Sequence, residues 1–223
     1  MSVEPEPSAT LVLLRDGARD VELLLLRKTP RHDGKERPWV FPGGKLEAAD
    51  LGERGDDLEG HARRAAVRET EEEAGLTVSA ADLITISRWI TPEIAPRRFD
   101  TWFFLSAVGH DASVRVDGSE ICEHRWLPPR EALAAHFTRE LRLAPPTFVT
   151  VSWLETYRRS ADAVAKLATE PVLTIRPVIR PIPDGACILY PGDVGYTGGD
   201  FERPGPRHRL WSGADGYRYE RSD

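Results

Sequence analysis

The chain has 223 residues, of which 40% are hydrophobic and 30% are charged, and its formal net charge is −6 at pH 7. This length allows one full domain with an appendage, and the composition is typical of a globular protein with a core. It has no apolar run that could span a bilayer, no signal peptide and no basic nucleic-acid footprint, so we expect a cytoplasmic protein that binds neither membranes nor nucleic acids.

The first part of the chain reads as strands and turns. Residues 1–8 are acidic and contain proline, and we expect them to form a flexible N-terminus ahead of a domain that begins at residue 9. The leucine-rich runs 10–15 and 21–29 flank an Asp-Gly turn and predict a hairpin whose strands are covered on both faces. A short apolar segment then leads into Gly43 and Gly44, where glycine lets the backbone approach a ligand closely.

A strongly acidic segment follows these glycines. Between residues 47 and 73 there are ten acidic residues and four arginines, so this segment carries nearly all of the net negative charge. Residues 51–60 are rich in glycine and charge and predict a surface loop. Residues 61–74 predict a helix, with Gly75 as the left-handed residue that ends it.

Three carboxylates gather on one face of this predicted helix. Glu72 and Glu73 both lie within about 60° of Glu69 on a helical wheel, and alanines on or beside the same face indicate close packing. Three like charges next to a packed face repel one another and are costly to desolvate. A divalent cation removes that cost, and oxygen ligands at this spacing suit Mg²⁺ or Mn²⁺. The pattern therefore predicts a metal site.

The rest of the chain completes one domain, residues 9–170, and adds an extension. The further predicted elements are strands at 83–90, 97–108 and 120–127, a short helix from residue 128 and one amphipathic helix over 146–169. Prolines and glycines recur from residue 171 to 223, which limits this extension to short strands and loops that we expect to pack on the domain.

This order of strand, Gly-Gly turn, carboxylate helix and strands resembles the Nudix hydrolases, whose signature is G-x5-E-x7-R-E-U-x-E-E-x-G-U with U apolar. The matching residues are Gly44, Asp50, Arg68, Glu69, Thr70, Glu72, Glu73, Gly75 and Leu76. Aspartate replaces the usual first glutamate, and ten residues are inserted after it, which leaves the role of Asp50 open. The resemblance implies a Nudix-type α/β/α sandwich with a mixed β-sheet, followed by a C-terminal helix and an irregular extension.

The resemblance also implies chemistry, namely attack of water on the diphosphate of a nucleoside-type substrate with Mg²⁺ or Mn²⁺ as cofactor. The catalytic residues it implies are Arg68, Glu69, Glu72 and Glu73, and the three glutamates are the metal ligands. Arg68 would hold the glutamates in place, and its position four residues before Glu72 permits an ion pair between them. The substrate-binding candidates are Gly43, Gly44 and Arg98, and the alternative for Arg97, Arg98 and Asp100 is a surface cross-strand ion pair. The general base stays open among Glu69, Glu93, Glu120 and Glu123.

A narrower resemblance concerns the substrate. The expanded motif, WVFPGGKLEAAD before it, WITPEIAPRRFDTWFF after it and IPDGACILYPGDVGY near the C-terminus look like the acyl-CoA diphosphatase branch. That branch implies cleavage of CoA or acyl-CoA to a 4′-phosphopantetheine product and adenosine 3′,5′-bisphosphate, and the family suggests a homodimer. The alternatives are hydrolysis of ADP-ribose, a nucleotide sugar or a dinucleoside polyphosphate, and a non-catalytic nucleotide-sensing domain.

Overall fold

The structure is a computed structural model that describes residues 3–30, 37–52, 57–200, 202–214 and 216–222. Within these residues the larger sheet has eight strands in the order β3-β2-β1-β6-β5-β8, with β4 paired to β1 and β7 paired to β2. Its strands are β1 (Glu6–Asp16), β2 (Val21–Lys28), β3 (Trp39–Val40), β4 (Gly43–Lys45), β5 (Ile84–Ile90), β6 (Phe99–Ala107), β7 (Ile121–Leu127) and β8 (Leu173–Ile175). The helices are α1 (Leu58–Ala74), α2 (Pro129–Phe137), α3 (Pro145–Leu154) and α4 (Ser160–Leu167), with short 3-10 turns at Ala48–Asp50 and Ala80–Asp82.

The sheet is mixed, as predicted. β1 runs parallel to β6 and β5 runs parallel to β8, whereas β1 pairs antiparallel with β2 and with β4. The pairing of β1 with β2 confirms the predicted hairpin. None of the helices in the described part of the chain combines the length and the apolar character that a membrane crossing requires.

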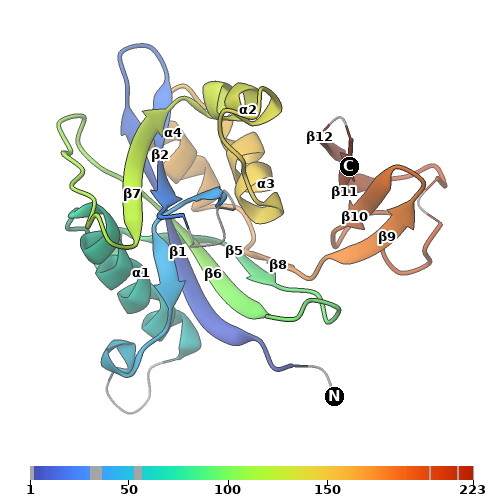
Figure 1. Cartoon of the computed structure of the whole chain (residues 1–223), viewed down its shortest axis with the longest axis horizontal. Coiled ribbons are helices and arrows are strands. Elements are labelled where there is room, and N and C mark those ends of the chain that lie inside the picture. The colour runs from blue at the N-terminus through green and yellow to red at the C-terminus, as the bar shows by residue number, and fades with distance from the viewer. Residues whose placement is uncertain (1–2, 31–36, 53–56, 201, 215, 223) are drawn as a thin grey trace.

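Helices cover both faces of the sheet, as Figure 1 shows for α1 on one side and α3 on the other. Successive residues of a strand point to opposite faces. Leu11 and Leu13 of β1 pack in one buried cluster with the alanines of α1, whereas Val12 and Leu14 belong to the cluster on the opposite face. The leucine-rich runs are therefore buried from both sides, which confirms the expectation drawn from them.

The flexible N-terminus predicted for residues 1–8 is wrong for its last three residues, because β1 begins at Glu6. The backbone of this segment pairs with Phe99 of β6 on one side and with Lys45 of β4 on the other. The hydroxyl of Ser8 also lies 2.7 Å from that of Thr101. Residues 1–2 lie outside the described part of the chain.

The single amphipathic helix predicted over 146–169 is two helices, α3 and α4. The carboxylate of Asp16, at the end of β1, accepts a hydrogen bond from the N–H of Ser160 at 2.7 Å. This contact satisfies a backbone donor in the first turn of α4, where no helical partner exists. The break is thus fixed by a residue 144 positions away, which helical periodicity does not reveal.

The C-terminal extension predicted as irregular forms a second, four-stranded antiparallel sheet in the order β12-β11-β10-β9. Its strands are β9 (Val178–Ile182), β10 (Gly185–Leu189), β11 (Arg207–Gly213) and β12 (Gly216–Ser222), and Figure 1 shows them beside the domain at the right. Tyr190 and Leu210 from this sheet belong to the same buried cluster as Trp89 of β5. The C-terminal extension therefore shares a buried cluster with β5.

The loop predicted for 51–60 is shorter than expected, and residues 53–56 within it lie outside the described part. α1 begins at Leu58, three residues before the predicted start, because the side chain of Asp57 accepts a hydrogen bond from the N–H of Gly60 at 2.8 Å. An aspartate at this position satisfies an N-terminal donor of the helix and favours initiation there.

Candidate active site

The last two turns of α1 carry the predicted carboxylates. Ala62, Ala65 and Ala66 are fully buried, so the helix lies close against the sheet. Gly75 ends the helix with a φ of 65°, and its N–H donates to the carbonyl of Glu71 at 2.9 Å. The predicted left-handed end of the helix is confirmed, and it stops α1 directly after the carboxylates.

The Gly43–Gly44 turn lies against two of these carboxylates. The N–H of Gly43 donates to Oε2 of Glu73 at 2.9 Å. A Cβ on Gly44 would lie 2.1 Å from Oε1 of Glu69, and a Cβ on Gly43 would lie 2.4 Å from the carbonyl oxygen of Ala9. Glycine is therefore required at both positions for β4 to fit between β1 and the two glutamates.

Glu73 is a buried carboxylate with an incomplete set of partners. Its exposed fraction is 3%, and within the described structure its Oε1 accepts no hydrogen bond and lies 3.3 Å from Nζ of Lys28. Burial raises the pKa of Glu73 to about 7, although Lys28 and the N–H of Gly43 act in the opposite direction. Burial also raises the pKa of Glu69. The surroundings of these two carboxylates disfavour their negative charge, which is the condition that a bound cation relieves.

Arg68 connects the carboxylates of α1 to Asp50. Its Nε and Nη2 donate to the two oxygens of Asp50 at 3.1 and 2.9 Å. Its Nη1 donates to Glu69 at 3.0 Å and to Glu72 at 2.9 Å, which confirms the ion pair expected four residues apart on the helix. Asp50 is 2% exposed and also accepts from the N–H of Glu47, so its carboxylate anchors Arg68 instead of facing a ligand.

Lys28, at the end of β2, is a site residue that the sequence motif does not contain. Its Nζ lies 3.3 Å from Oε1 of Glu73 and 2.8 Å from Oε1 of Glu120. Burial lowers the pKa of Lys28, but the contacts with these two carboxylates outweigh it and raise the pKa. The pairing of β2 with β7 brings Glu120 to this place. No spacing along the sequence indicates this contact.

The remaining candidates for the general base lie elsewhere. Glu93 is exposed in the loop between β5 and β6. Glu123 forms ion pairs with Arg27 at 2.8 Å and with Arg125 at 3.1 Å. Of the four candidate glutamates, Glu69 lies at the Gly43–Gly44 turn and Glu120 contacts Lys28.

Arg98 is not positioned as the sequence suggested. It is 8% exposed, and its guanidinium donates to the backbone carbonyls of Thr91 at 3.0 Å and of Val3 at 2.6 Å. The alternative expectation, a cross-strand ion pair, holds for Asp100, which accepts from both Nε and Nη2 of Arg88 on the paired strand β5, whereas Arg98 does not take part in that pair. Arg98 therefore holds the N-terminal segment and the β5–β6 connection together, and its predicted substrate contact has no structural support.

The carboxylates suit a hard divalent cation in kind, since Mg²⁺ and Mn²⁺ prefer oxygen ligands. Oε1 of Glu73 accepts no hydrogen bond within the described structure, so it could serve as a ligand of such an ion. In the part of the chain that the structure describes, no three His, Cys, Asp or Glu side chains are gathered as a ready metal cluster. One reason is that Glu72 is 57% exposed and paired with Arg68. Joint ligation by all three glutamates stays a prediction.

A family model described as NUDIX domain matches residues 5–147 of the chain. The chain belongs to the NUDIX family. This membership confirms the family predicted from the Gly44 to Leu76 motif.

Relatives of this NUDIX chain carry different substrate names. The human acyl-coenzyme A diphosphatase NUDT19 is 33% identical over 115 residues, which cover 49% of this chain and 31% of the human protein. The RNA pyrophosphohydrolase of Dinoroseobacter shibae is 30% identical over 118 residues, covering 46% of this chain and 68% of that protein. The crystal structure of a NUDIX hydrolase from Alicyclobacillus acidocaldarius is 26% identical, covers 76% of this chain and 99% of its own, and has a TM-score of 0.65.

The solved structure confirms the predicted sandwich fold. The chain spans less than a third of the human relative's length, so that relative's activity as a whole protein does not transfer directly. A shared fold supports many substrates, and the site must decide among them.

Proposed function

We propose that this protein is a divalent-metal-dependent diphosphatase that splits CoA or acyl-CoA into a 4′-phosphopantetheine product and adenosine 3′,5′-bisphosphate. The observation that carries the proposal is the meeting of Glu69 and Glu73 at the Gly43–Gly44 turn, where Oε1 of Glu73 is buried and accepts no hydrogen bond from the residues that the structure describes. NUDIX membership supports the diphosphate chemistry. The name of the human relative supports the choice of CoA-type substrates.

Each group of the site has a task in this proposal. Glu69, Glu72 and Glu73 would hold the cation next to the substrate diphosphate. When bound, Mg²⁺ or Mn²⁺ neutralises phosphate charge and lowers the pKa of a water molecule. Arg68, anchored by Asp50, keeps the outer carboxylates oriented. The water oxygen bonds to one phosphorus, the bridging P–O bond breaks, the bridging oxygen leaves with the other phosphate, and the water proton passes to one of the candidate glutamates.

A substrate panel tests the proposal. CoA, octanoyl-CoA, ADP-ribose, a dinucleoside polyphosphate and a 5′-triphosphorylated RNA are each incubated with the protein and Mg²⁺ or Mn²⁺, and the products are separated by mass. We expect adenosine 3′,5′-bisphosphate from the CoA compounds, and none of these products when a chelator removes the metal. Cleavage of the RNA or of ADP-ribose with intact CoA would replace the substrate assignment, and ligand binding without any cleavage would favour the sensing domain.

Replacing Glu72 tests the metal assignment. Glu72 is largely exposed, so Glu72→Gln should leave the unfolding temperature unchanged while turnover falls by about 100-fold or more, because the cation that stabilises the reacting phosphate loses a carboxylate ligand. The matched control is Glu71→Gln, an exposed neighbour outside the trio, which should keep wild-type turnover. Equal turnover in both variants would contradict the role of Glu72.

A further inference from the structure

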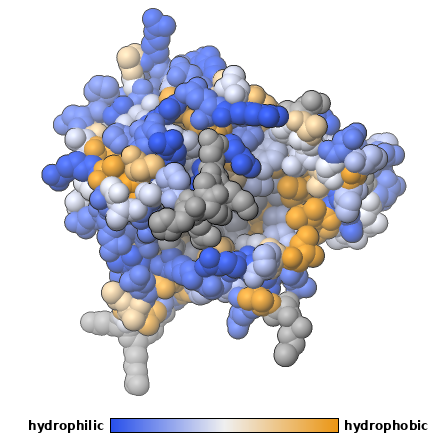
Figure 2. All heavy atoms as spheres, viewed as in Figure 1, coloured by the Kyte–Doolittle hydropathy of each residue, from blue (hydrophilic) through white to orange (hydrophobic). Residues whose placement is uncertain are grey.

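A second feature of the molecule is an apolar cavity of ≈ 490 Å³ between the large sheet and the C-terminal sheet. Figure 2 shows hydrophobic residues gathered in this region, between the body of the domain and the lobe at its right. Its volume lies within the range of about 300–1,000 Å³ that is typical of small-molecule sites. The C-terminal sheet supplies one wall with Ile179, Ile188 and Tyr190.

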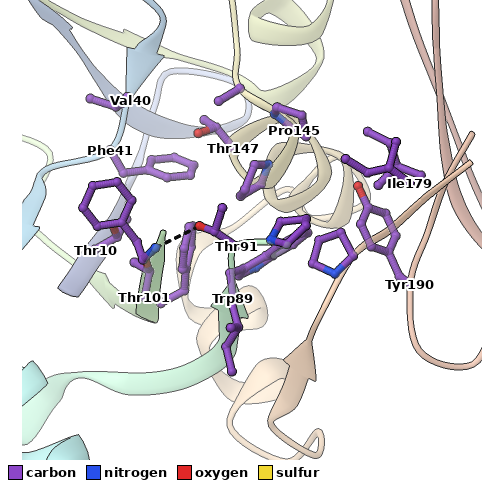
Figure 3. A pocket seen from close by; sticks show the side chains of 18 residues that line it. Thr10, Val40, Phe41, Trp89, Thr91, Thr101, Pro145, Thr147, Ile179 and Tyr190 are labelled. Atoms are coloured by element: carbon purple, nitrogen blue, oxygen red, sulfur yellow. Dashed lines mark hydrogen bonds between the residues drawn. The ribbon is translucent and has the colours of Figure 1, made fainter. Parts of the chain in front are cut away.

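The cavity and the carboxylate site lie close to each other at one short segment. Thr10 and Phe41 line it, on the side away from Tyr190 and Ile179, as Figure 3 shows. Two residues after Phe41, the N–H of Gly43 donates to Glu73, and Gly43 pairs with Thr10 across β1 and β4. A substrate whose diphosphate lies at the Gly43–Gly44 turn can therefore extend one of its halves into this cavity.

The chemistry of the lining selects which half enters. None of the described residues that line the cavity is charged. Two of its hydroxyls are already engaged, because Oγ1 of Thr91 accepts from the N–H of Phe99 at 3.0 Å and that of Thr101 lies 2.7 Å from the hydroxyl of Ser8. A nucleotide half carrying a 3′-phosphate would lose its hydration here without gaining a cation or a set of base-edge partners.

One polar group at the wall lacks a partner. Tyr190 is fully buried, and within the described structure its hydroxyl has no hydrogen-bond partner. Its ring is fixed edge-on against Trp89 with centroids 5.4 Å apart. A buried donor of this kind is suited to a neutral carbonyl oxygen brought by a ligand, such as that of an amide or a thioester.

We propose that this cavity binds the acyl-pantetheine half of the substrate, so that the enzyme acts on acyl-CoA in preference to free CoA. The acyl chain lies against the apolar wall of the C-terminal sheet, and the hydroxyl of Tyr190 donates to a carbonyl of the substrate. This inference rests on the proposed function for the diphosphate site, but the cavity has a ligand of its own that can be measured separately.

The probe is octanoyl-pantetheine, which contains the acyl-pantetheine half and no nucleotide. Its binding to the full-length protein is followed by calorimetry, and kcat/KM is compared for CoA and octanoyl-CoA. We expect saturable binding of the probe and a kcat/KM for octanoyl-CoA at least roughly tenfold above that for CoA, because the longer chain buries more apolar surface. Binding of adenosine 3′,5′-bisphosphate in the same cavity would overturn the proposal.

Two variants locate the binding. Ile179→Asp puts a charge on a partly exposed residue of the cavity wall at the edge strand β9 and should weaken probe binding by at least roughly tenfold. The matched control is Val172→Asp, an exposed apolar residue outside the cavity, which should bind the probe as the wild type does. Equal binding by these two variants would overturn the proposal.

Tyr190→Phe separates a binding role from a structural one. Since the hydroxyl has no hydrogen-bond partner among the described residues, the variant should unfold at the wild-type temperature or higher, while probe binding weakens by about fivefold. A lower unfolding temperature with unchanged binding would show a purely structural role and overturn this part of the proposal. Failure of the diphosphatase assignment can be told apart from failure of the cavity proposal, because CoA would then stay intact while the probe still binds.

Discussion

Two buried carboxylates, Glu73 in α1 and Asp193 between β10 and β11, differ in how far hydrogen bonds compensate their charge. Glu73 is 3% exposed and Asp193 is 6% exposed. Asp193 accepts four hydrogen bonds, two from Arg209 at 2.7 and 2.6 Å and one each from the N–H groups of His208 and Gly195. Glu73 accepts one from Gly43 and keeps an oxygen that has no such partner in the described structure.

The pKa values follow this difference. Burial raises the pKa of Asp193, but the hydrogen bonds from Arg209, His208 and Gly195 outweigh it and hold the pKa below its usual value. For Glu73, Lys28 and the N–H of Gly43 compensate only part of the effect of burial, and the pKa rises to about 7. A buried carboxylate whose charge is fully compensated by hydrogen bonds and an ion pair stabilises the fold. A buried carboxylate whose charge is compensated only in part is further stabilised when a cation binds to it. The comparison separates a structural carboxylate from a functional one, although both are nearly inaccessible to solvent.

The largest effect is expected from Asp193→Asn. The variant removes the negative charge of a buried ion pair with Arg209, and loss of one charge of such a pair costs about 3–5 kcal/mol of folding free energy. Chemical denaturation measures this loss. The control is Asp184→Asn, an exposed aspartate in the same sheet, for which we expect a change within about 0.5 kcal/mol. Equal stability of the two variants would contradict the conclusion that Asp193 stabilises the fold.

The pH dependence of this effect has a definite sign. The pKa of Asp193 is lowered by folding, so its contribution to stability is fully present above the unfolded pKa of about 3.9 and is lost as the pH falls through the folded value. The stability difference between wild type and Asp193→Asn should therefore be constant at neutral pH and shrink below about pH 4.

Gly44→Ala tests the functional carboxylates, because Gly44 lies against Glu69. Its Cβ would lie 2.1 Å from Oε1 of Glu69, so the carboxylate or β4 must move. Displacement of about 1 Å in a catalytic arrangement can cost roughly 100-fold in rate, and we expect kcat/KM for CoA to fall by about that factor. The control is Gly198→Ala, since a Cβ there meets no atom within 4 Å. Wild-type turnover by Gly44→Ala would exclude a close fit between the turn and Glu69.

The smallest expected effect is a gain in folding stability. With the metal removed by a chelator, Glu73→Gln should raise the free energy of unfolding by about 1–2 kcal/mol at pH 8, because it removes an incompletely compensated buried charge. The folded pKa of Glu73 is raised, so the wild type loses stability as the pH rises from about 4.5 to 7, and the gain should vanish near pH 5. A loss of stability at pH 8 would show that the ion pair with Lys28 outweighs the cost of burial.

The sequence alone determined the local parts of this protein. Helical spacing placed Glu69, Glu72 and Glu73 on one face and paired Arg68 with Glu72, because neighbours three and four residues apart on a helix meet whatever surrounds them. Gly75 marked the helix end for a similar reason, since only a residue that tolerates positive φ fits there. The family followed from these short-range patterns.

Only the tertiary structure decided the contacts that join distant segments. Asp50 meets Arg68, and Lys28 meets both Glu73 and Glu120, because strand pairing and helix packing bring these side chains together. The split between α3 and α4 depends on Asp16 in the same way. The proline-rich extension became a sheet and the wall of a cavity because its strands hydrogen-bond to one another and bury Tyr190 against Trp89. Such long-range pairings leave no periodic trace in the chain, since the free energy that selects them comes from burial and hydrogen bonding in the folded state.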